Sequence, residues 1–203
     1  MQMDLFTAPA ASPELASLPP AAQLLQHWLD SRQLRALDVA LARFCLQLAS
    51  DQHEVALLAA LLSRQLQDGH VCLRLDSLAQ ELQQAASADD SASPARWWTS
   101  RPLAQWLELL QNSPLVSSGA DSPPAPLVLQ HQRLYLYRMW RHETAVAQAV
   151  GQRLAQRYPL DAGFTAALNQ LFVTPVAGND WQKIACAMAA SGHFTLITGG
   201  PGT

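Results

Sequence analysis

The chain has 203 residues, of which 49% are apolar and 14% charged, and its formal net charge is −3. This length suits one large domain, or one medium domain with part of another. A protein that coats nucleic acid over its whole surface would be basic, so the charge argues against that class. We expect any DNA contact to be local or to come from residues beyond this sequence. No apolar run approaches the ~18 residues that span a bilayer, and we expect no membrane anchor.

The N-terminus and the cysteines indicate the compartment. No basic-then-apolar leader is present, which predicts a protein that is not exported. Cys45, Cys72 and Cys186 lie far apart within apolar segments, and this spacing suits neither a disulfide framework nor a zinc site. We expect buried structural thiols in a reducing, cytoplasmic location.

The first third of the chain predicts a tail and three helices. Residues 1–20 are rich in Ala, Pro and Ser and predict a flexible tail. Apolar residues at helical spacing predict helices over about 24–32, 37–48 and 53–67. An Asp-Gly pair ends the third helix, which has a wide apolar stripe.

A short strand, a helix and a loop are expected next. Residues 70–73 have strand-like composition, and Asp76 or Ser77 is positioned to cap a helix that ends near Gln84. Residues 85–96 are small and polar, which predicts a loop with no packing role.

Ordered structure is expected to resume at two tryptophans. Trp97 and Trp98 follow the loop, and Pro102 lies in the first turn of another helix. The apolar residues of that helix are Leu103, Trp106, Leu107 and Leu110. Residues 117–126 contain Ser, Gly and Pro and predict a second loop.

A β-hairpin and a helix complete this region. Strands over 127–129 and 134–137, joined by a turn at 130–132, have the aliphatic and aromatic content that strands favour. A helix is expected over about 143–157. The order helix, strand, helix, helix, hairpin over 53–138 is typical of a winged-helix domain.

The C-terminal region predicts two helices and a strand. A helix over about 164–172 follows a break near Tyr158, and residues 175–178 form a linker. Asn179 is positioned to cap a second helix, with Ile184, Ala187 and Met188 on its buried side. Residues 194–197 then form a short apolar run of the kind found inside parallel sheets.

The glycines after this run suggest a phosphate-binding loop. A P-loop reads G-x-x-x-x-G-K-[ST] between a strand and a helix, and Gly199 would be its first glycine. The four variable positions would be Gly200, Pro201, Gly202 and Thr203. Small residues let phosphate oxygens approach backbone N–H groups closely. The lysine and the Mg²⁺-binding hydroxyl would follow Thr203, so we expect no ATPase activity from these residues and loose packing of 191–203. The alternative is an ordinary glycine-rich turn.

Several segments resemble the RecD family, the alpha subunits of exonuclease V, which are superfamily one helicases. The segments are WQKIACAMA and FTLITGGPGT near the end, and LRALDV, DGHVCL, RLYLYRMW and Leu171-Phe172 before them. Together they cover nearly all of the chain beyond its tail. The resemblance implies an ATP-dependent 5′-to-3′ DNA motor that works with beta and gamma subunits in double-strand break repair and recombination.

The resemblance also assigns residues and domains. Gln182 matches a glutamine whose amide contacts adenine, and Gly199 to Thr203 match the phosphate loop, so ATP and Mg²⁺ are the implied cofactors of the whole motor. No catalytic residue and no metal ligand carries over. The implied fold is mainly α with a small β-hairpin: a winged-helix-like N-terminal domain, then the first helix and strand of a RecA-like P-loop motor. The expected segments are a tail over 1–20, a docking domain over 21–158, a connecting helix and linker over 159–178, and the start of the motor over 179–203.

Two functions compete for the N-terminal domain. The resemblance favours a docking module that ties the motor to its partner subunits. The residues also allow a winged-helix DNA contact, because Arg133, Arg138 and Arg141, with His131 and His142, lie on and just after the hairpin. If the glycine-rich end were only a turn, the chain would be a non-enzymatic DNA-binding or adaptor protein.

Overall fold

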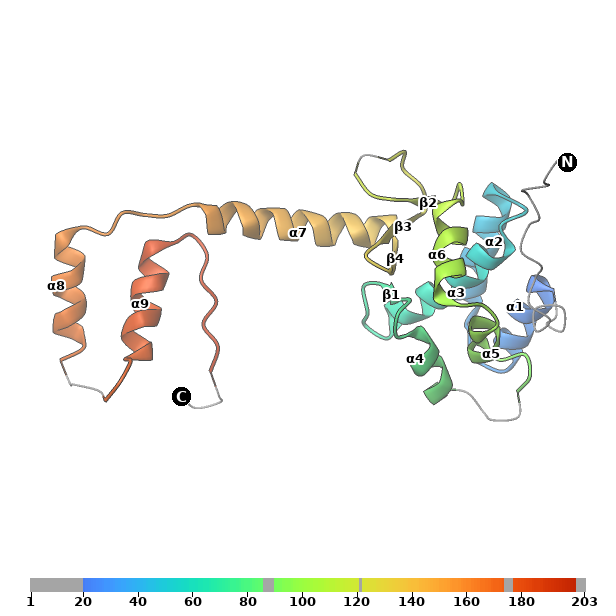
Figure 1. The fold of residues 1–203 in the computed structure, drawn as a ribbon, viewed down its shortest axis with the longest axis horizontal. Helices are drawn as coiled ribbons and strands as arrows, with labels where there is room; N and C mark the ends of the chain where they lie inside the picture. Colours follow the sequence, from blue (N-terminus) through green and yellow to red (C-terminus); the bar gives the residue numbers. More distant parts are fainter. Residues whose placement is uncertain (1–19, 86–89, 121, 174–176, 200–203) are drawn as a thin grey trace, which may run out of the picture. The chain divides into compact units, whose positions relative to one another are not determined.

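The computed structural model describes residues 20–85, 90–120, 122–173 and 177–199. These divide into two compact units, Met1–Trp140 and Arg141–Thr203. The first unit holds α1 (Ala21–Asp30), α2 (Ala36–Leu48), α3 (His53–Gln67), α4 (Leu78–Ala85), α5 (Pro94–Thr99) and α6 (Leu103–Gln111), with strands β1 (Leu73–Arg74), β2 (Val116–Ser117), β3 (Leu127–Gln130) and β4 (Arg133–Leu136). Helix α7 (Tyr137–Ala155) runs from the first unit into the second, which also holds α8 (Ala162–Leu171) and α9 (Trp181–Ser191). The prediction of a mainly helical chain with a small β component is confirmed (Figure 1).

Helix α3 is the centre of the first unit. All residues from Val55 to Ser63 are buried, so this stretch meets neighbours on every side. Its bounds are those predicted from the apolar stripe. A helix that is apolar all round is stable only inside a core, and α1, α2, β1 and β4 provide that core here.

A buried carboxylate fixes α2 against α3. Asp38 is fully buried, and its Oδ1 accepts a hydrogen bond of 2.7 Å from the hydroxyl of Ser63 on α3. Its Oδ2 accepts the backbone N–H of Arg35, at the start of α2, at 2.9 Å. A buried charge is tolerated only when it is hydrogen-bonded, so these contacts fix both the beginning of α2 and its orientation.

Four tryptophans fill the space between α1, α5 and α6. Trp106 stacks on Trp98 with ring centroids 5.0 Å apart, and its centroid lies 4.7 Å from that of Trp97. Trp97 also meets Trp28 of α1 edge-on at 5.6 Å. The indole N–H of Trp28 donates to the carbonyl of Ala92 at 2.7 Å, so this cluster has both apolar contact and satisfied polar groups.

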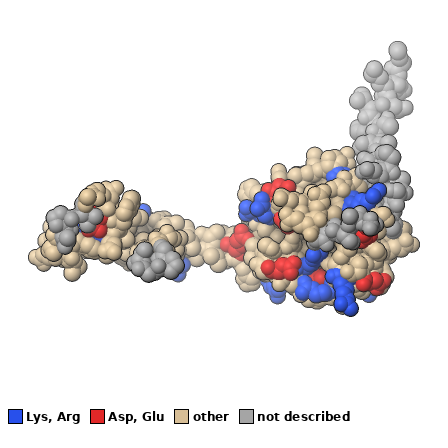
Figure 2. All heavy atoms as spheres, turned by 90° about the horizontal axis from the view of Figure 1, so that it is seen from below, with Lys and Arg blue, Asp and Glu red and all other residues tan. Residues whose placement is uncertain are grey.

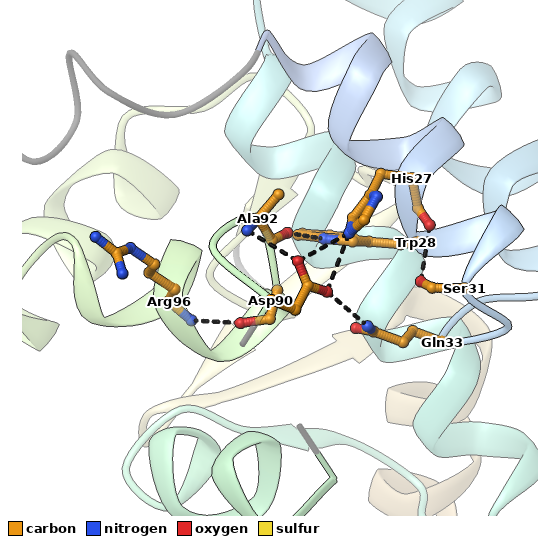
Figure 3. Close-up of polar contacts among 8 residues, drawn as sticks. His27, Trp28, Ser31, Gln33, Asp90, Ala92 and Arg96 are labelled. Atoms are coloured by element: carbon orange, nitrogen blue, oxygen red, sulfur yellow. Dashed lines mark hydrogen bonds and ion pairs between the residues drawn. The ribbon is translucent and has the colours of Figure 1, made fainter. Parts of the chain in front are cut away.

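The segment from Asp90 to Arg96 corrects the loop expected over 85–96. Asp90 accepts hydrogen bonds from His27 Nε2 at 2.9 Å, Gln33 Nε2 at 3.1 Å and the backbone N–H of Ala92 at 3.0 Å (Figure 3). Helix α5 then begins at Pro94, which lies inside the expected loop. Residues 86–89 lie outside the described part, but the segment after them is packed against α1 and has a structural role.

Burial and hydrogen bonds act in opposite directions on Asp90. Burial raises the pKa of its carboxyl group, whereas hydrogen bonds from His27, the Ala92 backbone and Gln33 lower it, and the net result is a pKa below the ordinary value. The ionised form of Asp90 is therefore more stable in the folded chain than in the unfolded chain.

The sheet is larger than the predicted hairpin. Its strand order is β1-β4-β3-β2, with β1 and β3 antiparallel to β4 and β2 parallel to β3. The strand expected over 70–73 is shorter and later, at Leu73–Arg74, because it extends only where it pairs with β4. Ser117, expected in a loop, belongs to β2.

Both faces of the hairpin are packed. Leu73, Leu127 and Leu134 point into the main core, whereas Val128 and Tyr135 pack with Trp140 of α7 in a second cluster. Helix α7 begins at Tyr137, six residues before the expected start at Glu143. Trp140, in the first turn of this helix, packs against Val128 and Tyr135 of the sheet. Tyr137 and Arg138 are accordingly helical, and Tyr137 is not the end of a strand.

The second unit differs from prediction near its end. Helix α9 is capped by Asp180, whose side chain accepts the N–H of Lys183 at 3.0 Å, in place of the expected Asn179. Ile184 and Met188, expected to be buried, are exposed. Residues 194–197 form no strand, because no neighbouring strand among the described residues pairs with them.

We predict that Asp90→Asn lowers the free energy of unfolding by about 1–2 kcal/mol at neutral pH, because its donors lose a charged acceptor. A lowered folded pKa stabilises the folded chain fully above the unfolded pKa of about 3.9, and this stabilisation is lost as the pH falls through the folded pKa. The difference between the two proteins in urea denaturation should therefore shrink below about pH 4.

The matched control for this measurement is Asp30→Asn. Asp30 is an exposed carboxylate that accepts a hydrogen bond from the exposed Gln26, so we expect a change below about 0.5 kcal/mol. A pH-independent effect of Asp90→Asn would contradict the ionisation argument.

Candidate docking surface and nucleotide loop

Helix α2 presents an apolar face to solvent. Val39, Ala42 and Cys45 point toward the core and are buried. On the opposite side, Leu37, Phe44 and Leu48 are 65%, 47% and 54% exposed. With the half-buried Leu41 between them, these four residues follow helical spacing over three turns and form what we call the α2 stripe.

The geometry of α2 makes this exposure unavoidable. The Asp38–Ser63 hydrogen bond and the burial of Val39, Ala42 and Cys45 leave the helix no freedom to rotate. Helical spacing in the sequence predicts that Leu37, Leu41, Phe44 and Leu48 lie on one helix, but it does not separate them from the inward residues. One sequence signal for the stripe is that apolar residues are spread widely around α2. A helix with one fully solvated face needs apolar residues only on its buried face.

Two exposed arginines belong to the same segment as the α2 stripe. Arg35 is the N-cap of α2 and contacts the buried Asp38 at 3.5 Å, and Arg43 lies on the helix. Figure 2 shows one face of the molecule, on which acidic and basic side chains are interspersed. The face in that view is therefore not a continuous basic surface, in agreement with the net charge of −3.

The expected nucleotide-contacting residues are only partly described. Gln182 lies in the first turn of α9 and is exposed, and Gly199 follows the extended segment after α9. Gly200, Pro201, Gly202 and Thr203 lie outside the described residues. Residues 193–199 connect to the rest of the second unit through Tyr158, whose ring stacks on His193 at 4.2 Å and whose N–H donates to the Ser191 carbonyl.

The three arginines proposed for DNA contact are all exposed, with Arg133 on β4 and both Arg138 and Arg141 on α7. Arg133 is on β4 directly opposite Arg74 of β1, and a side-chain hydrogen bond with Tyr135 raises the pKa of Arg133. Arg138 is on α7 at the end of the first unit, and Arg141 begins the second unit. The structure brings Arg133 next to Arg74. No local sequence pattern indicates that Arg74 belongs with the three predicted arginines.

Metal and thiol chemistry are limited. Among the described residues no group of three His, Cys, Asp or Glu side chains could hold a metal ion. Burial raises the pKa of Cys45 to about 11, so that thiol stays protonated and unreactive. Cys72 is half-buried, and Cys186 is exposed on α9, which corrects the expectation that all three thiols are buried.

No helix in the described part of the chain is long and apolar enough to cross a membrane.

Comparison with known proteins identifies the family. Residues 30–135 match the family described as RecBCD enzyme subunit RecD, N-terminal domain. The chain belongs to the RecD family. It is 35% identical over 161 residues to the RecBCD enzyme subunit RecD of Mycobacterium tuberculosis, which covers 79% of this chain and 24% of that protein. It is 28% identical over 155 residues to the protein of the same name from Haemophilus influenzae, which covers 72% of this chain and 24% of the relative.

The RecD match covers some candidate residues and not others. The chain spans about a quarter of the length of the curated relatives it matches, at 24% for both proteins above. The α2 stripe and Arg133 lie inside the region that matches the RecD N-terminal domain, residues 30–135. Arg138, Arg141, Gln182 and Gly199 lie beyond it.

We predict that the two faces of α2 respond differently to substitution. Phe44→Ser should change the free energy of unfolding by less than about 0.5 kcal/mol, because the side chain is exposed in the isolated chain. Val39→Ala removes buried methyl groups and should cost about 1–2 kcal/mol. Urea denaturation at several protein concentrations measures both values. Equal destabilisation by the two changes would mean that the stripe is covered within the chain.

Proposed function

We propose that this chain is the N-terminal part of an ATP-dependent 5′-3′ DNA helicase subunit of exonuclease V, a complex of double-strand break repair and recombination. We further propose that its first unit docks the motor to the beta and gamma subunits. Membership of the RecD family supports the first statement, since the relatives are named as subunits of the RecBCD enzyme. The α2 stripe is the observation that carries the second.

The composition of the α2 stripe suits a protein interface. Leu37, Phe44 and Leu48 are large apolar side chains that gain nothing from contact with water. Protein interfaces have an apolar, often aromatic centre surrounded by polar groups, and the stripe with Phe44 would form such a centre. The complementary surface would therefore contain an apolar groove.

The proposed architecture of the docking unit is winged-helix-like. Helices α3, α4 and α6 precede a hairpin of β3 and β4, and β1 pairs with β4 to give an antiparallel three-stranded sheet. This order supports the winged-helix interpretation, with α5 and β2 as additions. In this interpretation, β3 and β4 form the wing.

The proposed nucleotide site lies in the second unit. Gln182 would hydrogen-bond the adenine edge through its amide, and Gly199, Gly200, Pro201, Gly202 and Thr203 would approach the phosphates of ATP with Mg²⁺. The position of Gln182 in the first turn of α9, with its side chain exposed, supports this assignment. An amide offers one donor and one acceptor side by side, which matches the adenine edge.

A local DNA contact is the second candidate for the first unit. Like charges directly opposite each other destabilise a sheet, and Arg74 and Arg133 occupy such a pair. Asp76 contacts Arg74 at 3.0 Å and offsets part of that cost. Phosphates could offset the remainder, with Arg138 and Arg141 contributing from α7. The alternative of a non-enzymatic adaptor would need only these surfaces and no nucleotide loop.

We predict that Phe44→Ser weakens binding of the 203-residue chain to its partner subunit by roughly 30-fold, because a central aromatic contact contributes about 2 kcal/mol. Isothermal titration against the separately purified beta and gamma subunits measures the affinity. The control is Val146→Ser on α7, where an apolar residue that is also exposed, at 64%, lies outside the stripe and binding should be unchanged.

Binding assays on the same 203-residue chain and its variants distinguish docking from DNA contact. Binding that is insensitive to Phe44→Ser and Leu48→Ser, or no binding to either subunit, would refute the docking role. A salt titration of DNA binding tests the second candidate, since phosphate contacts weaken steeply with salt. In that assay Arg133→Gln should reduce both the affinity and its salt dependence, whereas the stripe variants should have no effect.

A further inference from the structure

A pocket lies between α6 and the tip of the hairpin, away from the α2 stripe. Its volume is about 430 Å³, within the range of small-ligand sites. Apolar side chains come from Leu107 of α6, Val116 of β2 and Leu129 of β3. The polar residues of the lining are Gln111, His131 and Gln132, together with Ser117 and Ser118.

The chemistry of the lining residues limits the class of ligand that the pocket can bind. None of the lining residues is Lys, Arg, Asp or Glu, so the pocket offers neither the charge that holds a phosphate nor the carboxylates that hold a divalent cation. Gln111 and Gln132 are exposed residues, and their amides can hydrogen-bond a ligand that has donors and acceptors at its edge. The remaining class is a neutral molecule with an apolar surface and hydrogen-bonding edges.

The backbone of the hairpin tip, which lines this pocket, is strained. His131 and Gln132 form the two-residue turn, and both have left-handed backbone angles, with φ of 47° and 59°. Turns of this type favour Asn and Gly, because other side chains are strained there. Both residues with left-handed backbone angles therefore also line the pocket.

We propose that this pocket binds an unpaired nucleobase. The ring would lie between the apolar side chains of Leu107 and Leu129, and its edge would meet the amides of Gln111 and Gln132. A glutamine amide pairs with a base edge through one donor and one acceptor, as it does with adenine in DNA recognition. The base could belong to single-stranded DNA or to a free nucleoside, and both present the same edge.

The test is titration of the 203-residue chain with neutral deoxynucleosides, followed by the NMR signals of the Gln111 and Gln132 side-chain amides. We expect both signals to shift, with adenine giving the largest change. The variant is His131→Gly with Gln132→Gly, which keeps the backbone hydrogen bond from Leu75 to the Gln132 carbonyl. It should weaken binding about tenfold or more through loss of the polar contacts.

This variant is also expected to fold well. Glycine relieves the left-handed strain, so its melting temperature should be unchanged or raised by about 2–4 °C. The matched control is Arg32→Gly, at a third left-handed residue (φ 58°) that does not line the pocket. It should show a similar thermal response with unchanged nucleoside binding.

Single strands identify the source of the base. A short oligonucleotide that binds more tightly than its nucleoside, and loses this advantage when one position is abasic, assigns the pocket to single-stranded DNA. Equal binding of strand and nucleoside assigns it to free nucleosides. Absence of shifts at Gln111 and Gln132, binding that survives in the double-glycine variant, or equal loss in Arg32→Gly would overturn the proposal.

Discussion

The burial of α3 on every side is the constraint on which the first unit depends. Small residues at Ala56, Ala59, Ala60 and Ser63 let neighbouring elements approach this helix closely, and the leucines between them fill the remaining space. The hydrogen bond from Ser63 to the buried Asp38 then fixes which side of α2 faces inward. The solvent-facing side of α2 is therefore determined by the packing of its neighbour.

The surfaces with functional interest occupy different parts of this framework. The α2 stripe lies on a rigid helix, which favours a stable protein interface over an adaptable one. The nucleobase pocket lies where α6, the edge strand β2 and the hairpin tip meet, and its polar groups come from a turn and a helix end. These two sites share no residue, so partner binding and base binding by the first unit would be separable by substitution.

The sequence predicted elements where local patterns and tertiary packing agree. The bounds of α3 follow from its apolar run and its Asp-Gly end, and the hairpin follows from its aliphatic and aromatic strands. Helix α5 was missed although Ser93 before Pro94 is a good helix start, because the polar residues before it suggested a continuous loop. The parallel pairing of β2, and the early start of α7, depend on contacts between distant residues, and no local pattern encodes them. The direction of the α2 stripe has the same origin, since Leu37 and Val39 are equally apolar in sequence.

The tryptophans divide by environment in a way that has a practical consequence. Trp28, Trp97, Trp98, Trp106 and Trp140 are buried in the first unit, whereas Trp181 is 72% exposed on α9. A dissolved quencher such as acrylamide would reach Trp181 first and leave the emission of the other indoles largely intact. Intrinsic fluorescence, without any attached dye, can thus report two properties separately. Quenching of Trp181 follows solvent access near the proposed adenine contact, and the emission of the buried indoles follows the integrity of the helical core.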